Sequence, residues 1–235
     1  MELYWRHDIR TVVLQGAGNN FCAGLDLKET SGSNSEDGSA PRRGPGAGLV
    51  AQRKISEIVI AMRRCPQPII SLWNGSAAGG GFAIMLASDV RIATPTARGN
   101  AAFIKIGLSA CDIGVSYFLP RLVGASVASE LMLTGRFINA ERSASLGLVS
   151  KIVAPEQLEA EARQLLSEMH ATTPLGLRLT KECLNFSIDA AGLEAAIAME
   201  DRNQILASAG EDFGEGVRAF LEKRPPVYGP AKAGG

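Results

Sequence analysis

Two segments of the chain have residue types that could stabilise a negatively charged oxygen. They are residues 20–28, NFCAGLDLK, and residues 77–83, AAGGGFA. Glycines allow a backbone to turn tightly and to approach a ligand closely. The apolar run that begins at Phe82 predicts a helix, and the first N–H groups of a helix lack intrahelical acceptors and carry partial positive charge. We therefore expect a backbone site for an oxyanion at this turn.

The same glycines have a simpler interpretation, because any one of them could serve only a turn or close packing. Neither segment is a Walker loop, since no Gly-Lys-Ser/Thr sequence follows, and neither has the GxGxxG spacing of a dinucleotide site. The four cysteines, at positions 22, 65, 111 and 183, have no metal-ligand spacing. We expect reduced thiols, no metal and no redox cofactor.

Short apolar runs alternate with helical patterns and would position these segments. The runs that predict buried strands are 11–14, 69–72, 90–93 and 149–153, with a further short apolar segment at 103–106. Helices are predicted at 49–64, 82–87, 126–133, 140–146 and 155–170, and then at 175–185, 192–207 and 213–223. This order indicates an α/β fold with an all-helical C-terminal third.

Composition excludes several classes of protein. The chain has 46% apolar and 20% charged residues, which is typical of a globular domain, and its 24 basic and 24 acidic side chains give no field for a nucleic-acid partner. Residues 1–10 do not form a secretory signal, no apolar run has the length of a membrane span, and the last residues are no peroxisomal address. We expect a cytoplasmic enzyme.

Other stretches follow the two glycine segments in a fixed order. They are ASDVRIA at 87–93, GL at 107–108, LPRLVG at 119–124, LTGR at 133–136, GLV at 147–149 and EGVRAFLEKR at 215–224. Together these segments, from Arg10 to Val227, resemble the crotonase (enoyl-CoA hydratase/isomerase) superfamily. The resemblance implies a spiral of ββα units that binds acyl-CoA, residues 1–172, and a helical region, residues 173–235, used to form a homo-trimer or, where two trimers pair, a hexamer.

The family usually has a further layer, including a β-hairpin, ahead of the strand at 11–14. We expect this N-terminal hairpin to be missing here.

The resemblance also assigns residues to the acyl-CoA site, and the coenzyme A part of the substrate is the only cofactor it implies. The backbone N–H groups of Leu25 and Gly80 would hold the thioester oxygen, and one such donor contributes about 2.7–4 kcal/mol to a transition state. The residues expected along the coenzyme A are Ala23, Asp26 and Lys28 at the adenine and pantetheine path, and Phe220 and Lys223 at the nucleotide end, from the same or a neighbouring subunit.

The chain departs from the family at the acid–base residues. Hydratases of the family place two glutamates across the substrate double bond, and these positions hold Ala83 and Phe103 here. Neither side chain can transfer a proton. Isomerases of the family that keep only the second glutamate are not matched either, because Phe103 occupies that position.

Asp112 is the nearest acid, in the loop 107–114. Family members that isomerise dienoyl-CoA carry a catalytic aspartate in this loop, although the alignment needs an extra residue here and those isomerases keep the second glutamate. The alternative is a loop aspartate that caps a helix starting at Ile113. We predict that Asp112 is the principal acid/base.

The predicted function is that of an acyl-CoA lyase or isomerase of fatty acid metabolism. The alternative is a catalytically silent acyl-CoA carrier or regulator, which Ala83 and Phe103 favour. A serine protease on the related spiral fold would need a Ser-His-Asp set, but His7 and His170 follow neither glycine segment at a suitable place.

Overall fold

The computed structural model describes residues 2–27 and 45–229 of the chain. The chain divides into two compact units. One, which we call the core unit, comprises Leu14–Met62 and Ser71–Leu158; the other, the helical unit, comprises Met1–Val13, Arg63–Ile70 and Glu159–Gly235. The functional boundary expected between residues 172 and 173 stays a prediction.

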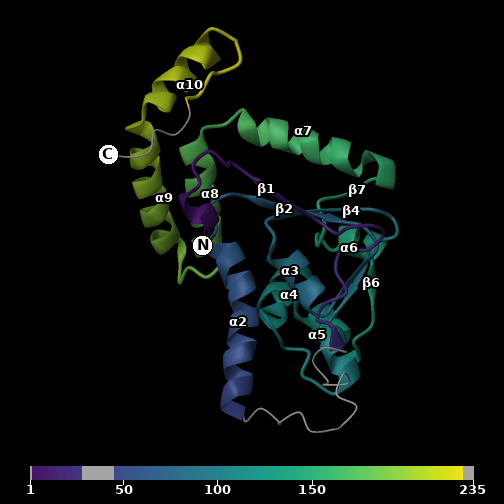
Figure 1. Cartoon of the computed structure of the whole chain (residues 1–235). Coiled ribbons are helices and arrows are strands. Elements are labelled where there is room, and N and C mark those ends of the chain that lie inside the picture. The colour runs from purple at the N-terminus through teal and green to yellow at the C-terminus, as the bar shows by residue number, and fades with distance from the viewer. Residues whose placement is uncertain (1, 28–44, 230–235) are drawn as a thin grey trace. The chain divides into compact units, whose positions relative to one another are not determined.

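The core unit contains short strands and helices in alternation (Figure 1). Its helices are α2 (Pro45–Arg64), which continues past the division, α3 (Gly80–Ala87), α4 (Val115–Val123), α5 (Ala125–Thr134) and α6 (Ala140–Ser145), with 3-10 turns η2 (Ala102–Ile106) and η3 (Pro155–Gln157). Its strands are β3 (Ser76–Ala78), β4 (Val90–Ala93), β5 (Arg98–Asn100), β6 (Ile138–Asn139) and β7 (Lys151–Ile152). Strands β1 (Val12–Gln15) and β2 (Ile69–Trp73) run through the division.

The strands form two different sheets. One sheet has the order β1-β2-β4-β7 and the other β3-β5-β6. Strands β4 and β7 are parallel, as are β3 and β5, whereas β5 and β6 are antiparallel. Along the chain, β2 and β3 precede α3, and β4 and β5 precede α4. Each of these two ββα units therefore contributes its first strand to one sheet and its second strand to the other. This pattern agrees with the expected α/β spiral of ββα units.

Helix α3 is buried on nearly every side, which suits its continuous apolar sequence. Phe82, Met85 and Leu86 are each at most 1% exposed and belong to one core cluster with Trp73. A side chain at Gly99 of β5 would overlap the Phe82 ring, so β5 passes directly over the helix. The helix that follows the glycine turn is therefore fixed in place by the core.

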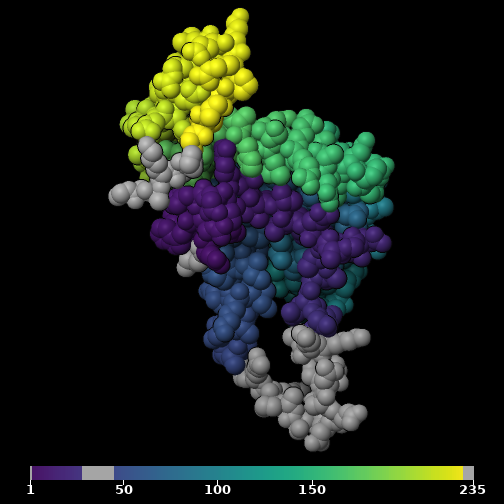
Figure 2. Space-filling view, turned by 45° about the horizontal axis from the view of Figure 1, so that its top comes forward, coloured from purple at the N-terminus to yellow at the C-terminus, as the bar shows by residue number. Residues whose placement is uncertain are grey.

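The helical unit contains η1 (Glu2–Trp5), most of α7 (Leu158–His170), and α8 (Pro174–Ser187), α9 (Leu193–Ser208) and α10 (Glu211–Leu221). Figure 2 shows the N-terminal residues against α7. The Arg10 guanidinium donates to the carbonyls of His170 and Thr172 at 3.0 and 2.5 Å, and Arg178 donates to the carbonyl of Tyr4 at 3.0 Å. Of the helices in the described ranges, none is long and apolar enough to cross a membrane.

Candidate active site

The two glycine segments lie side by side as extended backbone. Cys22 forms a parallel bridge with Ala77. The Cys22 N–H donates to the carbonyl of Ser76 at 3.2 Å, and the Ala78 N–H donates to the carbonyl of Cys22 at 2.9 Å. A Cβ atom at Gly81 would overlap the Cys22 carbonyl, so this close approach requires glycine. Segments that are distant in the sequence therefore meet at one place.

Each segment has a glycine with positive φ directly before the residue whose N–H is expected to hold the thioester oxygen. Gly24 and Gly79 have φ of 92° and 53°, values that favour glycine. Gly80 is the first residue of α3. A Cβ at Gly24 would lie 3.3 Å from the Gly80 nitrogen, which shows how close the two backbones are. Within the described ranges, neither the Leu25 nor the Gly80 N–H donates to a backbone carbonyl.

A cavity of about 360 Å³ lies beside these amides, within the core unit, and has the size of a small-molecule site. Both glycine segments line it, including Ala23, Leu25 and Gly80. Most of the remaining lining is apolar and comes from α2, α3, η2 and the loop before α4: Ile55, Ile58, Val59, Ile84, Phe103, Ile106, Leu108 and Ile113. Such a wall suits a hydrocarbon group rather than a polar one.

Among the described residues that line this cavity, Asp112 is the one that has a carboxylate. Its Oδ1 accepts hydrogen bonds from Gln52 Nε2 at 2.5 Å and from the Ile113 N–H at 2.8 Å. Helix α4 begins at Val115, with Gly114 at its N-cap, rather than at Ile113. The Asp112 side chain thus bonds a loop amide ahead of the helix.

The two positions expected to hold glutamates in hydratases have apolar side chains here and lie in apolar surroundings. Ala83 is fully buried in α3, and Phe103 lines the cavity. The Phe103 ring stands 3.5 Å from the place of a Cβ at Gly79, so it packs against the glycine turn itself. Neither position offers a group that could activate water.

The other residues expected to contact coenzyme A are distributed over both units. Asp26 lies in the first glycine segment, between cavity-lining Leu25 and Leu27. Lys28 lies outside the described residues. Phe220, near the end of α10, is 84% exposed, and Lys223 follows that helix in the helical unit. Their contacts with coenzyme A stay predictions.

Sequence reasoning missed Gln52 and the cavity wall formed by α2. A signal was present, because Gln52, Ile55, Ile58 and Val59 share one helical face at spacings of three and four residues. That apolar spacing indicates a helix but cannot distinguish a face that covers the core from one that lines a cavity.

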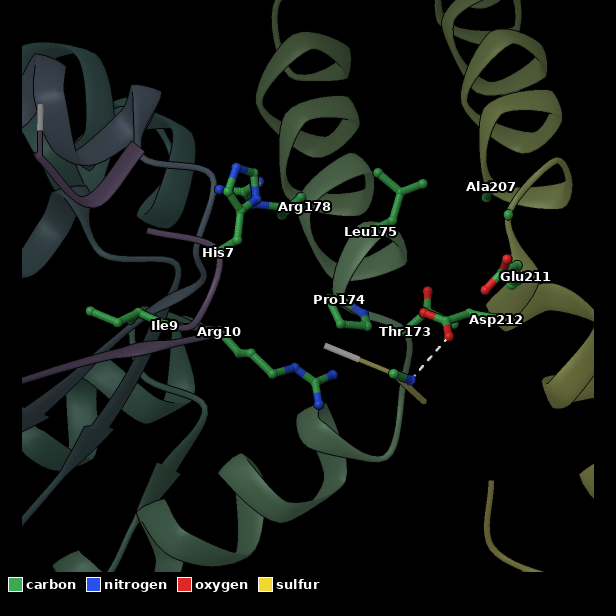
Figure 3. Close-up of a pocket in the computed structure, with 12 residues that line it drawn as sticks. His7, Ile9, Arg10, Thr173, Pro174, Leu175, Arg178, Ala207, Glu211 and Asp212 are labelled. Atoms are coloured by element: carbon green, nitrogen blue, oxygen red, sulfur yellow. Dashed lines mark hydrogen bonds between the residues drawn. The ribbon is translucent and has the colours of Figure 1, made fainter. Parts of the chain in front are cut away.

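A larger cavity, about 480 Å³, lies in the helical unit (Figure 3). It holds Arg10 and Arg178 together with the acids Glu211 and Asp212. Arg10 donates to main-chain carbonyls after α7, and Arg178 bonds His7 Nδ1 at 2.9 Å. Burial lowers the pKa of Arg10. Because these guanidinium groups already hold the unit together, and neither of the two glycine segments borders this cavity, the core-unit cavity is the better candidate for chemistry.

Comparison with known proteins decides the family. The family model for enoyl-CoA hydratase/isomerase matches residues 3–231. The chain belongs to the enoyl-CoA hydratase/isomerase family. This agrees with the resemblance of the glycine segments and with the α/β fold described above.

Curated members of the enoyl-CoA hydratase/isomerase family are similar along most of the chain. It is 39% identical over 232 residues to "Probable enoyl-CoA hydratase echA12" of Mycobacterium leprae, covering 98% of this chain and 78% of that protein. It is 35% identical over 220 residues to the 1,2-epoxyphenylacetyl-CoA isomerase of Escherichia coli, covering 94% and 81%. Proteins similar to this chain are thus named both as hydratases and as an isomerase.

A solved enoyl-CoA hydratase from Bacillus anthracis has the same fold. It superposes with a TM-score of 0.87 at 32% sequence identity, over 97% of this chain and 84% of that one. The expected crotonase-like α/β architecture is therefore confirmed, while the trimer-forming role of the C-terminal helices and the missing hairpin stay predictions.

Proposed function

We propose that this protein moves the double bond of an acyl-CoA thioester, with Asp112 as the proton carrier and the N–H groups of Leu25 and Gly80 holding the thioester oxygen. The observation that carries the proposal is that both glycine segments and one carboxylate border the same apolar cavity. The similarity to the 1,2-epoxyphenylacetyl-CoA isomerase supports an isomerisation of an acyl-CoA, although the substrate in that enzyme's name is an epoxide.

The reaction on a 3-enoyl-CoA follows from this arrangement. Asp112 takes a proton from C2, and the electrons of the broken C–H bond pass into the thioester, which becomes a dienolate. The negative charge on its oxygen is stabilised by the two amides, which are oriented before the reaction begins. Asp112 then returns the proton to C4, the double bond forms between C2 and C3, and the carboxylate is restored.

Isomerisation fits the described lining of this cavity better than hydration. Hydration requires a group that activates water and a group that delivers a proton to carbon. With Ala83 and Phe103 at the hydratase positions, one carboxylate is left to do both. A single base that takes and returns the same proton needs no water, and the apolar wall around it disfavours bound water.

The remaining expected contacts complete the proposal. Ala23, Asp26 and Lys28 would lie along the pantetheine and adenine, and Phe220 and Lys223 near the nucleotide. A silent acyl-CoA carrier is the second candidate, favoured by the fact that the Asp112 Oδ1 atom already accepts two hydrogen bonds within the protein.

Three measurements test the proposal: isomerisation of trans-3-octenoyl-CoA, hydration of trans-2-octenoyl-CoA, and exchange of the C2 protons of phenylacetyl-CoA with deuterated water. Isomerisation should exceed hydration by at least about tenfold, because each absent acid–base group contributes 10²–10⁴-fold. Proton exchange should occur as well, because Asp112 is only half-buried, so its carboxyl proton can exchange with solvent while the two amides hold the enolate. Binding of octanoyl-CoA with neither isomerisation nor exchange would favour the carrier and overturn the proposal.

A further inference from the structure

The two hydrogen bonds to Asp112 end on the same oxygen. Gln52 Nε2 and the Ile113 N–H both donate to Oδ1, at 2.5 and 2.8 Å. The two carboxylate oxygens are therefore not equivalent. Oδ1 accepts both hydrogen bonds, so a substrate that bonded Oδ2 would displace neither of these protein donors.

Gln52 reaches Asp112 from a different element. It lies on α2, whereas Asp112 lies in the loop before α4, and 60 residues separate them. Both side chains line the cavity. Gln52 precedes Ile55 by one helical turn, so the face of α2 that supplies the apolar wall also supplies the donor.

The loop at Asp112 has an unfavourable backbone conformation. Ile113 has φ of 34°, a value that a β-branched side chain rarely adopts. Such a residue persists only where surrounding contacts enforce it, and these places cluster at functional sites. The Ile113 side chain is 7% exposed and packs in the core cluster, and its N–H is one of the two donors to Asp112. The loop is thus held in one position around the carboxylate.

We propose that Gln52 is a positioning residue that fixes the Asp112 carboxylate so that Oδ2 alone carries the proton between substrate carbons. This inference rests on the proposed function. A carboxylate accepts at both oxygens, and a protonated carboxyl keeps its second oxygen as an acceptor. The Gln52 amide can therefore donate to Oδ1 both before and after Oδ2 takes the proton, and it prevents rotation that would exchange the two oxygens.

Two substitutions at position 52 separate positioning from packing. Gln52→Met has a similar length but no donor, whereas Gln52→Lys restores a donor of similar reach. Lys54→Met, at an exposed position on the same helix, is the control. The readouts are kcat and KM for trans-3-octenoyl-CoA, the Kd for octanoyl-CoA, and the thermal midpoint of each variant.

We expect Gln52→Met to lower kcat about 10- to 100-fold, because small displacements of a reacting group have effects of this size. KM and Kd should stay within about twofold of wild type, Gln52→Lys should recover most of kcat, and Lys54→Met should match wild type. A wild-type kcat in Gln52→Met would overturn the positioning role, and so would an equal loss in Gln52→Met and Gln52→Lys. Absence of isomerisation and proton exchange in the wild-type protein would instead overturn the proposed function, and the role of Gln52 with it.

Discussion

The Cys22 carbonyl accepts a hydrogen bond from the Ala78 N–H at 2.9 Å, and the same carbonyl stands where a side chain at Gly81 would have to be. The first relationship holds the two glycine segments together. The second explains why the third glycine of the GGG sequence cannot carry a side chain, although it is not one of the residues expected to donate to the thioester oxygen.

Gly81→Ala should therefore damage both stability and activity. Forcing a methyl group into this contact would move the first segment away from α3, at a cost of about 1–3 kcal/mol in the free energy of unfolding. Isomerisation should fall because the Leu25 and Gly80 amides would separate. Gly48→Ala is the matched control, since Gly48 is in α2 with open space around it, and it should be neutral or slightly stabilising. Urea denaturation and steady-state kinetics measure the two effects, and an unchanged free energy of unfolding in Gly81→Ala would contradict the overlap.

Asp112→Asn should abolish most proton transfer without changing the conformation of the loop before α4. The amide oxygen can still accept from Gln52 and from the Ile113 N–H, so the shape of the cavity is retained. We expect isomerisation to fall by about 10²–10⁴-fold, the usual contribution of a general acid–base group. Octanoyl-CoA affinity, measured by calorimetry, should be retained. Asp201→Asn, at an exposed position on α9, provides the comparison. Activity of Asp112→Asn equal to that of the comparison variant would assign the proton transfer to another group.

Phe103→Ala should enlarge the cavity beside the glycine turn. Because Phe103 is only partly buried, we expect a loss of about 1–3 kcal/mol in the free energy of unfolding, less than for a fully buried ring. The value of kcat/KM should rise for acyl groups with a branch or ring relative to straight chains. Phe137→Ala, whose ring is 46% exposed, is the control. Unchanged selectivity across a series of acyl-CoA thioesters would show that Phe103 does not limit the acyl group.

Glu215 should make stability depend on pH in the acid range. A hydrogen bond from Arg224, then one from the Val227 N–H, lower the pKa of Glu215 from 4.5 to about 2. A lowered carboxyl pKa gives stability that is present above pH 4.5 and lost as pH falls toward 2. Glu215→Gln should therefore unfold at a lower temperature than wild type at pH 7, and the difference should shrink as pH falls through this window.

Glu159→Gln is the control for this pH dependence. Glu159 lies 3.8 Å from Arg163, and both side chains are mostly exposed, so its removal should change little at any pH. Thermal midpoints at several pH values compare the three proteins. A difference between wild type and Glu215→Gln that stays constant down to pH 2 would contradict the assigned role of the ion pair.

Strands with continuous apolar sequences could be predicted from the sequence, and strands without them could not. The run 90–93 was predicted with the bounds that β4 has, and 69–72 differs from β2 by one residue. Strands β3 and β5, Ser76–Ala78 and Arg98–Asn100, were missed because they lack β-branched and aromatic residues. They are strands because they pair with each other. The apolar segment 103–106 belongs to a 3-10 turn instead of a strand.

The candidate site was predictable only in part. The glycine segments have a local signature, and their resemblance to the crotonase superfamily implied Leu25 and Gly80 as the donors, which stays a prediction. The Gln52–Asp112 hydrogen bond joins residues far apart in the chain, and no local pattern fixes such a pair. Helix α4 begins at Val115 rather than at Ile113, the start that the capping alternative for Asp112 required, and Gly114 at its N-cap has a left-handed conformation.

The turn at Gly79 also depends on residues that never reach the cavity. Its N–H donates to the Asn100 carbonyl at 3.0 Å, and the Asn100 side chain, 5% exposed, donates to the Gly135 carbonyl at 2.9 Å. A survey of natural variants that scores only cavity-lining positions would rate changes at Asn100 and Gly135 as having no effect on activity. Changes at either residue would be transmitted through β5 to the Gly80 amide, and would be recorded as unexplained loss of activity in an apparently intact pocket.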